Sequence, residues 1–538
     1  MFSKLKLFLS TCLLFLLSAT TVAAEPTAII DIDMDNPTTS TIRPVWTQTN
    51  IWDIGQMPQD RKTTIIREII LMTATGGRPT NNMATILPDG SLKCDFTSLT
   101  LALDRALNLK LIPTIVLGNT PDCLSTSTEI REFEVNTLPP TKTELYSQYI
   151  EELFKCLAER YGKLRVLSWH YRLMTEPDNS SWWTGNGMKG YCELYDLTVA
   201  AARRALPDIV IDGGNYMNCG KLKGTSWVEA WPRWIASNES KTSAALPHKI
   251  ASISFSGYCH ISPKHSASQI GLDPRNLKSI MDTLKTCTEK HISYPLRYYI
   301  AEGQQLYDEN QKYLWLGDGT EKGAAWNAAM IKQAHDTGLD RNVQWGWGGL
   351  ADSNLQSPVH HTLQMFEAML GDHILPLNIQ TQNTTDSLYL DAIATTANDG
   401  TIRIIAFSYD WAVRDNPEQT PVTINLSTHK DSTKYAVEQW RIDREHSNFM
   451  TQWIKDSANL KMVDRGCNSG SHYDLDVRHT LDDEGLKVWN SNIEKYRAMD
   501  DLELMEPSQT VETKDGKLSL SLSLPSNSVA QFVIRPLN

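Results

Sequence analysis

Short apolar, β-branched or aromatic runs recur along the first two thirds of the chain, and a segment with helical spacing follows each run. The eight runs centre on Val45-Trp46, Ile69-Leu71, Ile112-Val116, Val166-Trp169, Ile209-Ile211, Ile253-Phe255, Tyr298-Ile300 and Val343-Trp347. Alternating strands and helices are typical of βα units around a parallel sheet, and eight units suit a closed barrel. We therefore predict an α/β fold with a (β/α)8 TIM barrel over residues 41–372.

The helical segments of this region have recognisable boundaries and apolar faces. Between Thr143 and Arg160, apolar residues recur at helical spacing along one face. Asp273 and Pro274 supply an N-cap and a first-turn proline for a helix that continues from Leu277. Both segments are predicted to be helices that pack against the barrel.

After Leu370 and Gly371 the pattern changes to alternating apolar and polar positions, which indicates antiparallel strands. These strands are predicted at Ser387–Ile393, Ile402–Tyr409, Tyr435–Ile442, Leu518–Leu524 and Val529–Ile534. We predict an accessory C-terminal antiparallel β-sandwich over residues 373–538. Within residues 25–40, the extended run Ile29–Asp33 is a candidate strand for this sandwich rather than for the barrel. The polar span Asn459–Asp483 is predicted to be a long surface excursion.

Residues 1–24 have the order of a secretory signal peptide. Lys4 and Lys6 precede the apolar run Leu7–Leu17, and small residues lead to a predicted cleavage site near Ala24. The alternative is a membrane anchor, but this run is shorter than the ~20 residues that span a bilayer. Since no later segment is apolar enough to span, we expect a secreted or periplasmic protein without a membrane span in its mature form.

Charge and cysteine usage narrow the possible partners and cofactors. The chain has 51 Lys and Arg against 63 Asp and Glu, a net charge of −12, which argues against binding to nucleic acid or to an anionic membrane. Eight of its nine cysteines follow the leader, and their pairing stays open. Because neither C-x-x-C nor H-E-x-x-H occurs, we expect no metal site and no organic cofactor.

Two glutamates lie where a barrel would place catalytic groups. Glu176 follows the predicted fourth strand and Glu302 ends the seventh, and barrel active sites form at the carboxyl ends of strands. A retaining glycosidase needs two carboxyl groups about 5–5.5 Å apart, one protonated and one ionised. Burial and a close negative partner would raise the pKa of the acid. Taken alone, each glutamate could instead cap a helix or pair with a neighbour such as Arg172.

Several segments resemble glycoside hydrolase family 39, a clan A family that contains β-xylosidases and α-L-iduronidases. Trp169–Asn179 (WHYRLMTEPDN) is similar to the family's acid/base segment, and Tyr298–Gln304 (YYIAEGQ) is similar to its nucleophile strand. Trp440–Trp453 (WRIDREHSNFMTQW) resembles a pattern from the family's sandwich domain. The resemblance implies a barrel with a sandwich companion, Glu176 as acid/base and Glu302 as nucleophile.

Two positions depart from the family's pattern. The clan has an asparagine immediately before the acid/base, where its amide binds the sugar 2-hydroxyl, whereas this chain has Thr175. A hydroxyl is shorter than a carboxamide, so either the sugar is presented differently or another residue makes that contact. After the nucleophile, Gly303-Gln304-Gln305 replaces the family's Trp-Asn, which predicts a rebuilt subsite around Glu302.

Further residues are candidates for contact with a sugar, each with packing inside the protein as the alternative. Tyr258 and His260 are two apart on a strand and share a side, as do Trp345 and Trp347. An indole face suits stacking on a sugar ring, and Trp183 lies in the loop beside Glu176. The predicted substrate-binding residues are Thr175, Tyr258, His260, Trp345, Trp347 and Trp183.

These patterns together predict a secreted retaining glycoside hydrolase that cleaves a polysaccharide or oligosaccharide through a glycosyl-enzyme intermediate. A non-catalytic carbohydrate-binding protein on a glycosidase barrel is one alternative, and an inverting glycosidase is another. The sugar, its anomeric configuration, exo or endo action, recognition of sulfated or uronic groups and the oligomeric state stay open.

Overall fold

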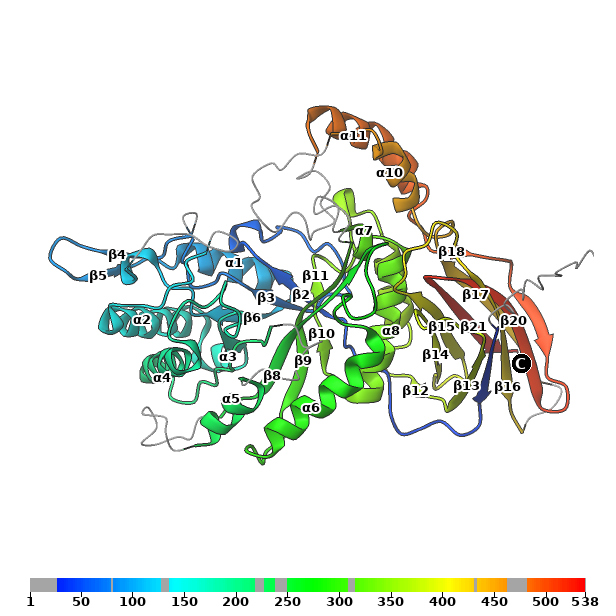
Figure 1. The fold of residues 1–538 in the computed structure, drawn as a ribbon, viewed down its shortest axis with the longest axis horizontal. Coiled ribbons are helices and arrows are strands. Elements are labelled where there is room, and N and C mark those ends of the chain that lie inside the picture. Colours follow the sequence, from blue (N-terminus) through cyan, green and yellow to red (C-terminus); the bar gives the residue numbers. More distant parts are fainter. Residues whose placement is uncertain are drawn as a thin grey trace, which may run out of the picture.

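The computed structural model describes residues 27–78, 81–126, 135–217, 227–237, 249–307, 315–429, 433–461 and 481–537. It contains a part with parallel strands and helices and a part made mainly of antiparallel strands, in which β1 (Thr27–Asp33) and β16 (Gln419–Ser427) form a parallel pair. The two parts lie side by side (Figure 1). The predicted signal peptide at residues 1–24 lies outside the described residues. No helix in the described ranges is both long and apolar enough to cross a membrane.

The parallel strands form two hydrogen-bonded groups. One group has the order β11-β2-β3-β6-β7 and the other β10-β9-β8, and every pairing within them is parallel. The strands are β2 (Gln48–Ile51), β3 (Glu68–Leu71), β6 (Ile112–Leu117), β7 (His170–Leu173), β8 (Ser252–Ile261), β9 (Arg297–Tyr307), β10 (Arg341–Asn342) and β11 (Gln344–Trp345). Their near-continuous apolar runs are explained by burial, since helices cover parallel strands.

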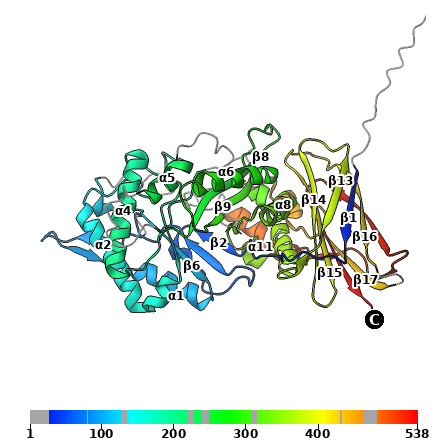
Figure 2. The same cartoon turned by 90° about the horizontal axis from the view of Figure 1, so that it is seen from below.

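Helices surround these strands (Figure 2). They are α1 (Thr97–Asn108), α2 (Thr143–Tyr161), α3 (Lys163–Leu167), α4 (Gly187–Ala205), α5 (Trp227–Ala236), α6 (Leu277–Glu289), α7 (Trp315–Asp318), α8 (Glu321–Thr337) and α9 (Pro358–Glu367). Short 3-10 turns are η1 (Ile54–Gln56), η2 (Asp122–Leu124), η5 (Pro274–Asn276) and η7 (Asp352–Asn354), and β4 (Ala84–Ile86) pairs with β5 (Leu92–Cys94). The predicted helices at α2 and α6 are confirmed, and Asp273 caps η5 directly before α6.

Four of the predicted strands differ from the structure. The run at Val45-Trp46 lies before its strand, because β2 begins only at Gln48. The prediction at Val166-Trp169 is wrong, because Val166 lies in α3 and β7 begins only at His170. Ile209-Ile211 belongs to no described strand, although isolated parallel bridges join residues 212–216 to β7 and β8. β9 continues to Tyr307, so Glu302 lies inside its strand and not at its end.

The antiparallel part has two sheets with a shared apolar core. One has the order β13-β1-β16-β20 and the other β12-β14-β15-β21-β17-β18, with β19 also paired to β17. The strands are β1 (Thr27–Asp33), β12 (His373–Ile374), β13 (Leu377–Gln382), β14 (Leu388–Thr396), β15 (Ile402–Asp410), β16 (Gln419–Ser427), β17 (Lys434–Ile442), β18 (Glu503–Leu504), β19 (Gln509–Glu512), β20 (Lys517–Pro525) and β21 (Ser528–Pro536). The N-terminal strand β1 lies between β13 and β16, inside this part.

Two helices, α10 (Met450–Ser457) and α11 (Asp483–Arg497), interrupt the antiparallel strands and were not predicted. They lie together (Figure 1) and share a small core in which Trp453 contacts Trp489 with ring centroids 4.8 Å apart. Leu355, from the segment after β11, is buried in the same core. Of the predicted surface excursion Asn459–Asp483, residues 462–480 lie outside the described ranges.

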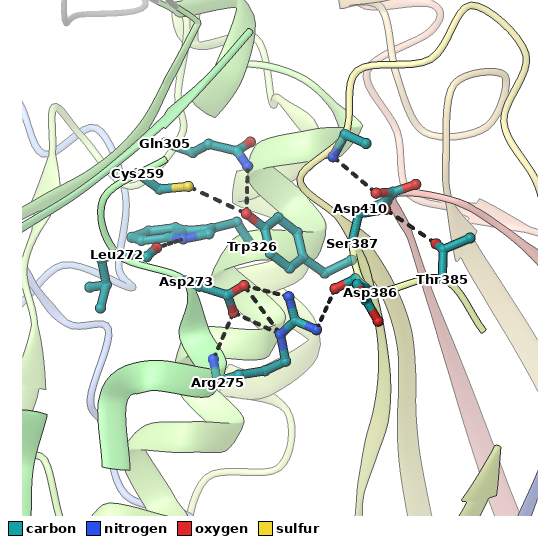
Figure 3. Close-up of polar contacts among 12 residues, drawn as sticks. Cys259, Leu272, Asp273, Arg275, Gln305, Trp326, Thr385, Asp386, Ser387 and Asp410 are labelled. Atoms are coloured by element: carbon teal, nitrogen blue, oxygen red, sulfur yellow. Dashed lines mark hydrogen bonds and ion pairs between the residues drawn. The ribbon is translucent and has the colours of Figure 1, made fainter. Parts of the chain in front are cut away.

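Polar contacts join the antiparallel part to β8, β9 and η5 (Figure 3). The Tyr409 hydroxyl on β15 lies 3.3 Å from Cys259 Sγ and accepts a hydrogen bond from Gln305 Nε2 at 3.5 Å. Arg275 donates to the carbonyl oxygen of Asp386 at 2.8 Å and also binds the Asp273 carboxylate. The antiparallel part therefore holds the same two strands that carry Glu302 and Tyr258.

Candidate active site

Glu302 lies next to an irregularity in the pairing of β8 with β9. Phe255 pairs with Ile300, but the next residue, Ser256, pairs with Glu302, so Ala301 is an extra residue in β9. Such bulges redirect the side chain that follows them and are frequent beside active sites. The extra residue explains how a glutamate inside a long strand is presented to groups on β7 and β8.

Three side chains donate hydrogen bonds to the Glu302 carboxylate. Arg172 Nη2 and Asn215 Nδ2 each lie 3.5 Å from Oε1, and the Tyr258 hydroxyl lies 3.3 Å from Oε2. Glu302 is only 5% exposed. Its pKa is raised above the ordinary value, first by burial and then by the negative charge of Glu176, whereas Arg172, Tyr258 and Asn215 oppose the rise.

Glu176 is held on a backbone that L-residues rarely adopt. Met174 has φ +64° and Glu176 has φ +42°, so two residues of the turn after β7 are left-handed. The Glu176 amide donates to Asn215 Oδ1 at 3.4 Å, and Asn179 Nδ2 donates to Glu176 Oε2 at 3.1 Å. At 7% exposure, the carboxyl group is buried but still reached by solvent.

The charges at the site favour one shared proton on the two glutamates. Their mutual repulsion contributes to the raised pKa of Glu302, and two close carboxyl groups of this kind titrate as a pair. The sequence predicts a raised pKa for the acid Glu176, whereas in the structure it is the pKa of Glu302 that is raised. The three donors to Glu302 stabilise its ionised form, so the geometry allows Glu302 to be the carboxylate while the pair keeps a proton. Burial also raises the pKa of the neighbouring Asp178 to about 6.

Part of the chain matches a known protein family in sequence. Residues 80–228, which include Glu176 and Asn215, match the family described as "Glycosyl hydrolases family 39". A curated β-xylosidase of Caldicellulosiruptor saccharolyticus is 29% identical over 126 residues, which are 23% of this chain and 26% of that protein. Over this part of its length, the chain is similar to glycoside hydrolase family 39. Its match spans about a quarter of the length of the curated relatives.

Solved structures share the fold over nearly the whole chain. The GH39 enzyme from Xanthomonas axonopodis pv. citri has a TM-score of 0.71 at 14% identity, and the alignment covers 97% of this chain and 99% of that one. A monomeric β-xylosidase from Caulobacter crescentus has a TM-score of 0.69 at 16% identity and covers 95% of this chain and 100% of that one. Because the sequence identity is so low, these structural similarities are evidence for the fold alone.

Three of the predicted substrate-binding residues lie around the glutamates. Thr175 is 7% exposed, and its hydroxyl accepts a hydrogen bond from Arg172 Nη2 at 3.2 Å. Tyr258 contacts Glu302, and its ring centroid lies 6.3 Å from that of His260. The two rings are therefore neighbours on β8, as the alternation predicts. Contact of any of them with a sugar stays a prediction.

Two of the predicted tryptophans, Trp183 and Trp347, pack against apolar parts of the protein. Trp183 is buried, donates from Nε1 to the Gly187 carbonyl at 2.9 Å, and packs edge-on against Tyr191. Trp347 follows β11 and packs partly buried against the main core. The backbone of Trp345 belongs to β11, but its side chain lies outside the described structure. Their roles in sugar binding stay predictions, and packing accounts for the observed position of Trp183.

Sequence reasoning missed two residues that contact the glutamates. Arg172 was named as an ion-pair partner for either glutamate, and its described ion pair is with Glu302. Asn215 and Asn179 were not considered as site residues, because asparagine beside glycine or serine usually indicates a turn. A usable signal was their position: Asn215 follows the predicted fifth strand, and Asn179 lies three residues after Glu176. Within the described residues, no group of three or more His, Cys, Asp or Glu side chains is arranged to hold a metal ion.

Proposed function

We propose that this chain is a retaining glycoside hydrolase that uses Glu302 as nucleophile and Glu176 as acid/base. The single observation that carries the proposal is the buried Glu302, which accepts from Arg172, Tyr258 and Asn215 beside a second, strained glutamate. The similarity to family 39 supports it, since this is a retaining clan A family. Two carboxyl groups, one ionised and one protonated, are the groups that double displacement requires.

In the first step, the Glu302 carboxylate attacks the anomeric carbon and forms a bond to it while the glycosidic C–O bond breaks. Glu176 gives its proton to the departing oxygen. In the second step, Glu176 removes a proton from water, and the water oxygen displaces Glu302 from the sugar. After the first step Glu176 carries the negative charge, and after the second step Glu302 carries it again. One negative charge therefore stays in the pocket with Arg172 throughout. The donors on Glu302 hold its oxygens in place throughout.

We infer that the parallel strands close into a (β/α)8 barrel around this site. β10 pairs with β9 and β11 pairs with β2, and only Val343 separates β10 from β11. Isolated bridges connect residues 212–216 to β7 and β8. A cavity of about 160 Å³ is lined by residues from all eight strand positions, namely Gln48, Glu68, Thr114, His170, Asp212, Ser252, Arg297 and Arg341. A common lining of this kind supports a closed ring of strands.

For the substrate, we propose a β-D-xyloside as the first candidate, since two curated relatives are named β-xylosidases. Thr175 in place of asparagine leaves the contact with the sugar 2-hydroxyl altered, so other glycosides belong in the same panel. We also propose export from the cytoplasm, supported by the leader-like order of residues 1–24. Sequencing the N-terminus of the secreted protein tests this, and an intact Met1 would contradict it.

The activity is tested with aryl glycosides and two glutamate variants. Glu302→Gln is expected to lower kcat by at least about 10⁴-fold for every aryl glycoside that the wild-type protein cleaves. Glu176→Gln is expected to impair poor leaving groups far more than 2,4-dinitrophenol, because a good leaving group needs little protonation. Glu445→Gln, a change outside the pocket, is the matched control. Near-normal turnover by Glu302→Gln would refute the assignment.

The anomeric form of the first product separates the competing mechanisms. Retention, followed by proton NMR before mutarotation, is expected for double displacement. An inverted product would instead assign an inverting glycosidase. Binding of oligosaccharides without product from any glycoside in the panel would assign a carbohydrate-binding protein.

A further inference from the structure

One carboxamide, that of Asn215, contacts both glutamates. Its Oδ1 accepts from the Glu176 backbone amide at 3.4 Å, and its Nδ2 donates to Glu302 Oε1 at 3.5 Å and to Ser256 Oγ at 2.7 Å. The residue is fully buried, with 0% exposure. It therefore lies behind the carboxylates, where it can orient them but cannot itself touch a substrate.

The local sequence explains why this side chain comes so close. Asn215 forms an isolated parallel bridge with Thr175, the residue directly before Glu176. A Cβ on Gly214 would lie 2.7 Å from Pro177 Cδ and 2.8 Å from the Leu173 carbonyl oxygen, so only glycine permits this approach. The Tyr191 hydroxyl accepts from the Gly214 amide at 2.6 Å and donates to that same carbonyl at 3.1 Å. The segment is thus fixed to the end of β7 on both sides.

The direction of the carboxamide is set by its partners. An amide N–H can only donate, so Oδ1 must face Glu176 and Nδ2 must face the two oxygen acceptors. Thr175 does not supply an amide, and its own hydroxyl is engaged by Arg172. The carboxamide that donates to Glu302 therefore comes from the neighbouring segment and not from the position that precedes the acid/base.

We propose that Asn215 is a positioning residue that links the acid/base turn to the nucleophile, so that a single side chain fixes Glu176 relative to Glu302. The inference rests on the proposed function for its consequence in turnover. Its effect on the pKa of Glu302 does not depend on that function, because removal of a hydrogen-bond donor from Glu302 favours the protonated carboxyl group. The other charged or titratable groups around Glu302 are Arg172 on β7, Tyr258 on β8 and Glu176 itself, and they are unchanged in the variants below.

The first test is the pH profile of Asn215→Ala and Asn215→Asp. Loss of the donor is expected to move the acid limb of kcat/KM upward by about one pH unit in the alanine variant, and further in the aspartate variant. We expect kcat to fall about 10- to 100-fold while KM changes less than about threefold, because a buried residue does not bind the sugar. Tyr195→Phe is the matched control, since it removes a 2.7 Å bond to Ile211 in the same segment without touching either glutamate.

An acid limb identical to that of the wild type in folded Asn215 variants would overturn the proposal. So would an equal loss of kcat in Tyr195→Phe at the same melting temperature, because that result would assign a structural role only. If the wild-type protein cleaves no glycoside, the proposed function fails, and a second measurement still decides the role of Asn215.

That measurement is thermal unfolding between pH 4 and pH 8. Without the donor, the pKa of Glu302 rises further in the folded state, so the destabilisation by Asn215→Ala should grow as pH rises. In the Glu302→Gln background, the same substitution should lower Tm by an amount that does not depend on pH. A pH-independent effect in both backgrounds would overturn the link between Asn215 and Glu302.

Discussion

Arg172 is the cation closest to the proposed nucleophile, and its removal tests the electrostatics of the site. It is fully buried on β7, and its Nη2 lies 3.5 Å from Glu302 Oε1. Its Nε and Nη1 have no hydrogen-bond partner among the described residues. Arg172→Met therefore removes a buried charge and few other bonds, while the apolar stem still fills most of the space.

The magnitude follows from the distance and the surroundings. At 3.5 Å and an effective dielectric of about 20, the Coulomb attraction is about 5 kcal/mol. Carboxyl groups beside an arginine typically shift by about 1–3 pKa units, or roughly 1.4–4 kcal/mol. This lower range applies here, because Arg172 also donates a hydrogen bond to Thr175. Loss of the cation should raise the pKa of Glu302 by about 1–3 units.

The assay is kcat/KM for an activated aryl glycoside between pH 4 and pH 9. A raised pKa leaves less ionised nucleophile, so at pH values below the acid limb the variant should be about 10- to 1,000-fold slower and should recover at higher pH. Arg172→Lys, which keeps the charge, should shift the limb less. A folded Arg172→Met protein with an unmoved acid limb would refute the reasoning.

Three further variants test the buried groups around the site. Burial raises the pKa of Glu302 in the folded state, so its contribution to stability is present below its unfolded-state pKa and is lost as pH rises. Glu302→Gln should therefore raise the free energy of unfolding by about 1–3 kcal/mol at pH 8 and by less at pH 4, as measured by urea unfolding. Burial raises the pKa of Asp318 to about 7, so Asp318→Asn should gain stability relative to wild type between pH 4 and pH 8, and equal pH curves would contradict this. Tyr409→Phe removes the hydroxyl that meets Cys259 and Gln305, and it should cost about 1–2 kcal/mol of unfolding free energy and lower kcat severalfold with KM unchanged. An unfolding curve identical to wild type would show that these interdomain bonds contribute nothing.

Much of the fold follows from hydrophobic periodicity. The antiparallel strands alternate because one face is buried, and the predicted runs match β14, β15, β17, β20 and β21 within a few residues. Helix α2 was equally readable, since its apolar face continues through five turns. α11 was missed although Trp489 and Tyr496 lie seven residues apart on one helical face.

The site could be predicted only in part. Glu176 and Glu302 stand out because acids near strand ends are rare in an apolar pattern and because their segments resemble family 39. The bulge at Ala301 leaves no mark in a sequence, since any small apolar residue can occupy it. The approach of Asn215 depends on packing between segments 39 residues apart, as the bond to Glu176 shows, and local propensity does not report such contacts.

The most direct test of the central claim is covalent capture of the nucleophile. The protein is incubated with a 2,4-dinitrophenyl 2-deoxy-2-fluoroglycoside of the sugar that it cleaves fastest, because fluorine slows release of the glycosyl-enzyme intermediate. Peptide mass spectrometry should then find one sugar attached to Glu302, together with release of one equivalent of dinitrophenol. A label on Glu176, or a turnover that leaves no labelled peptide and yields an inverted product, would contradict the account.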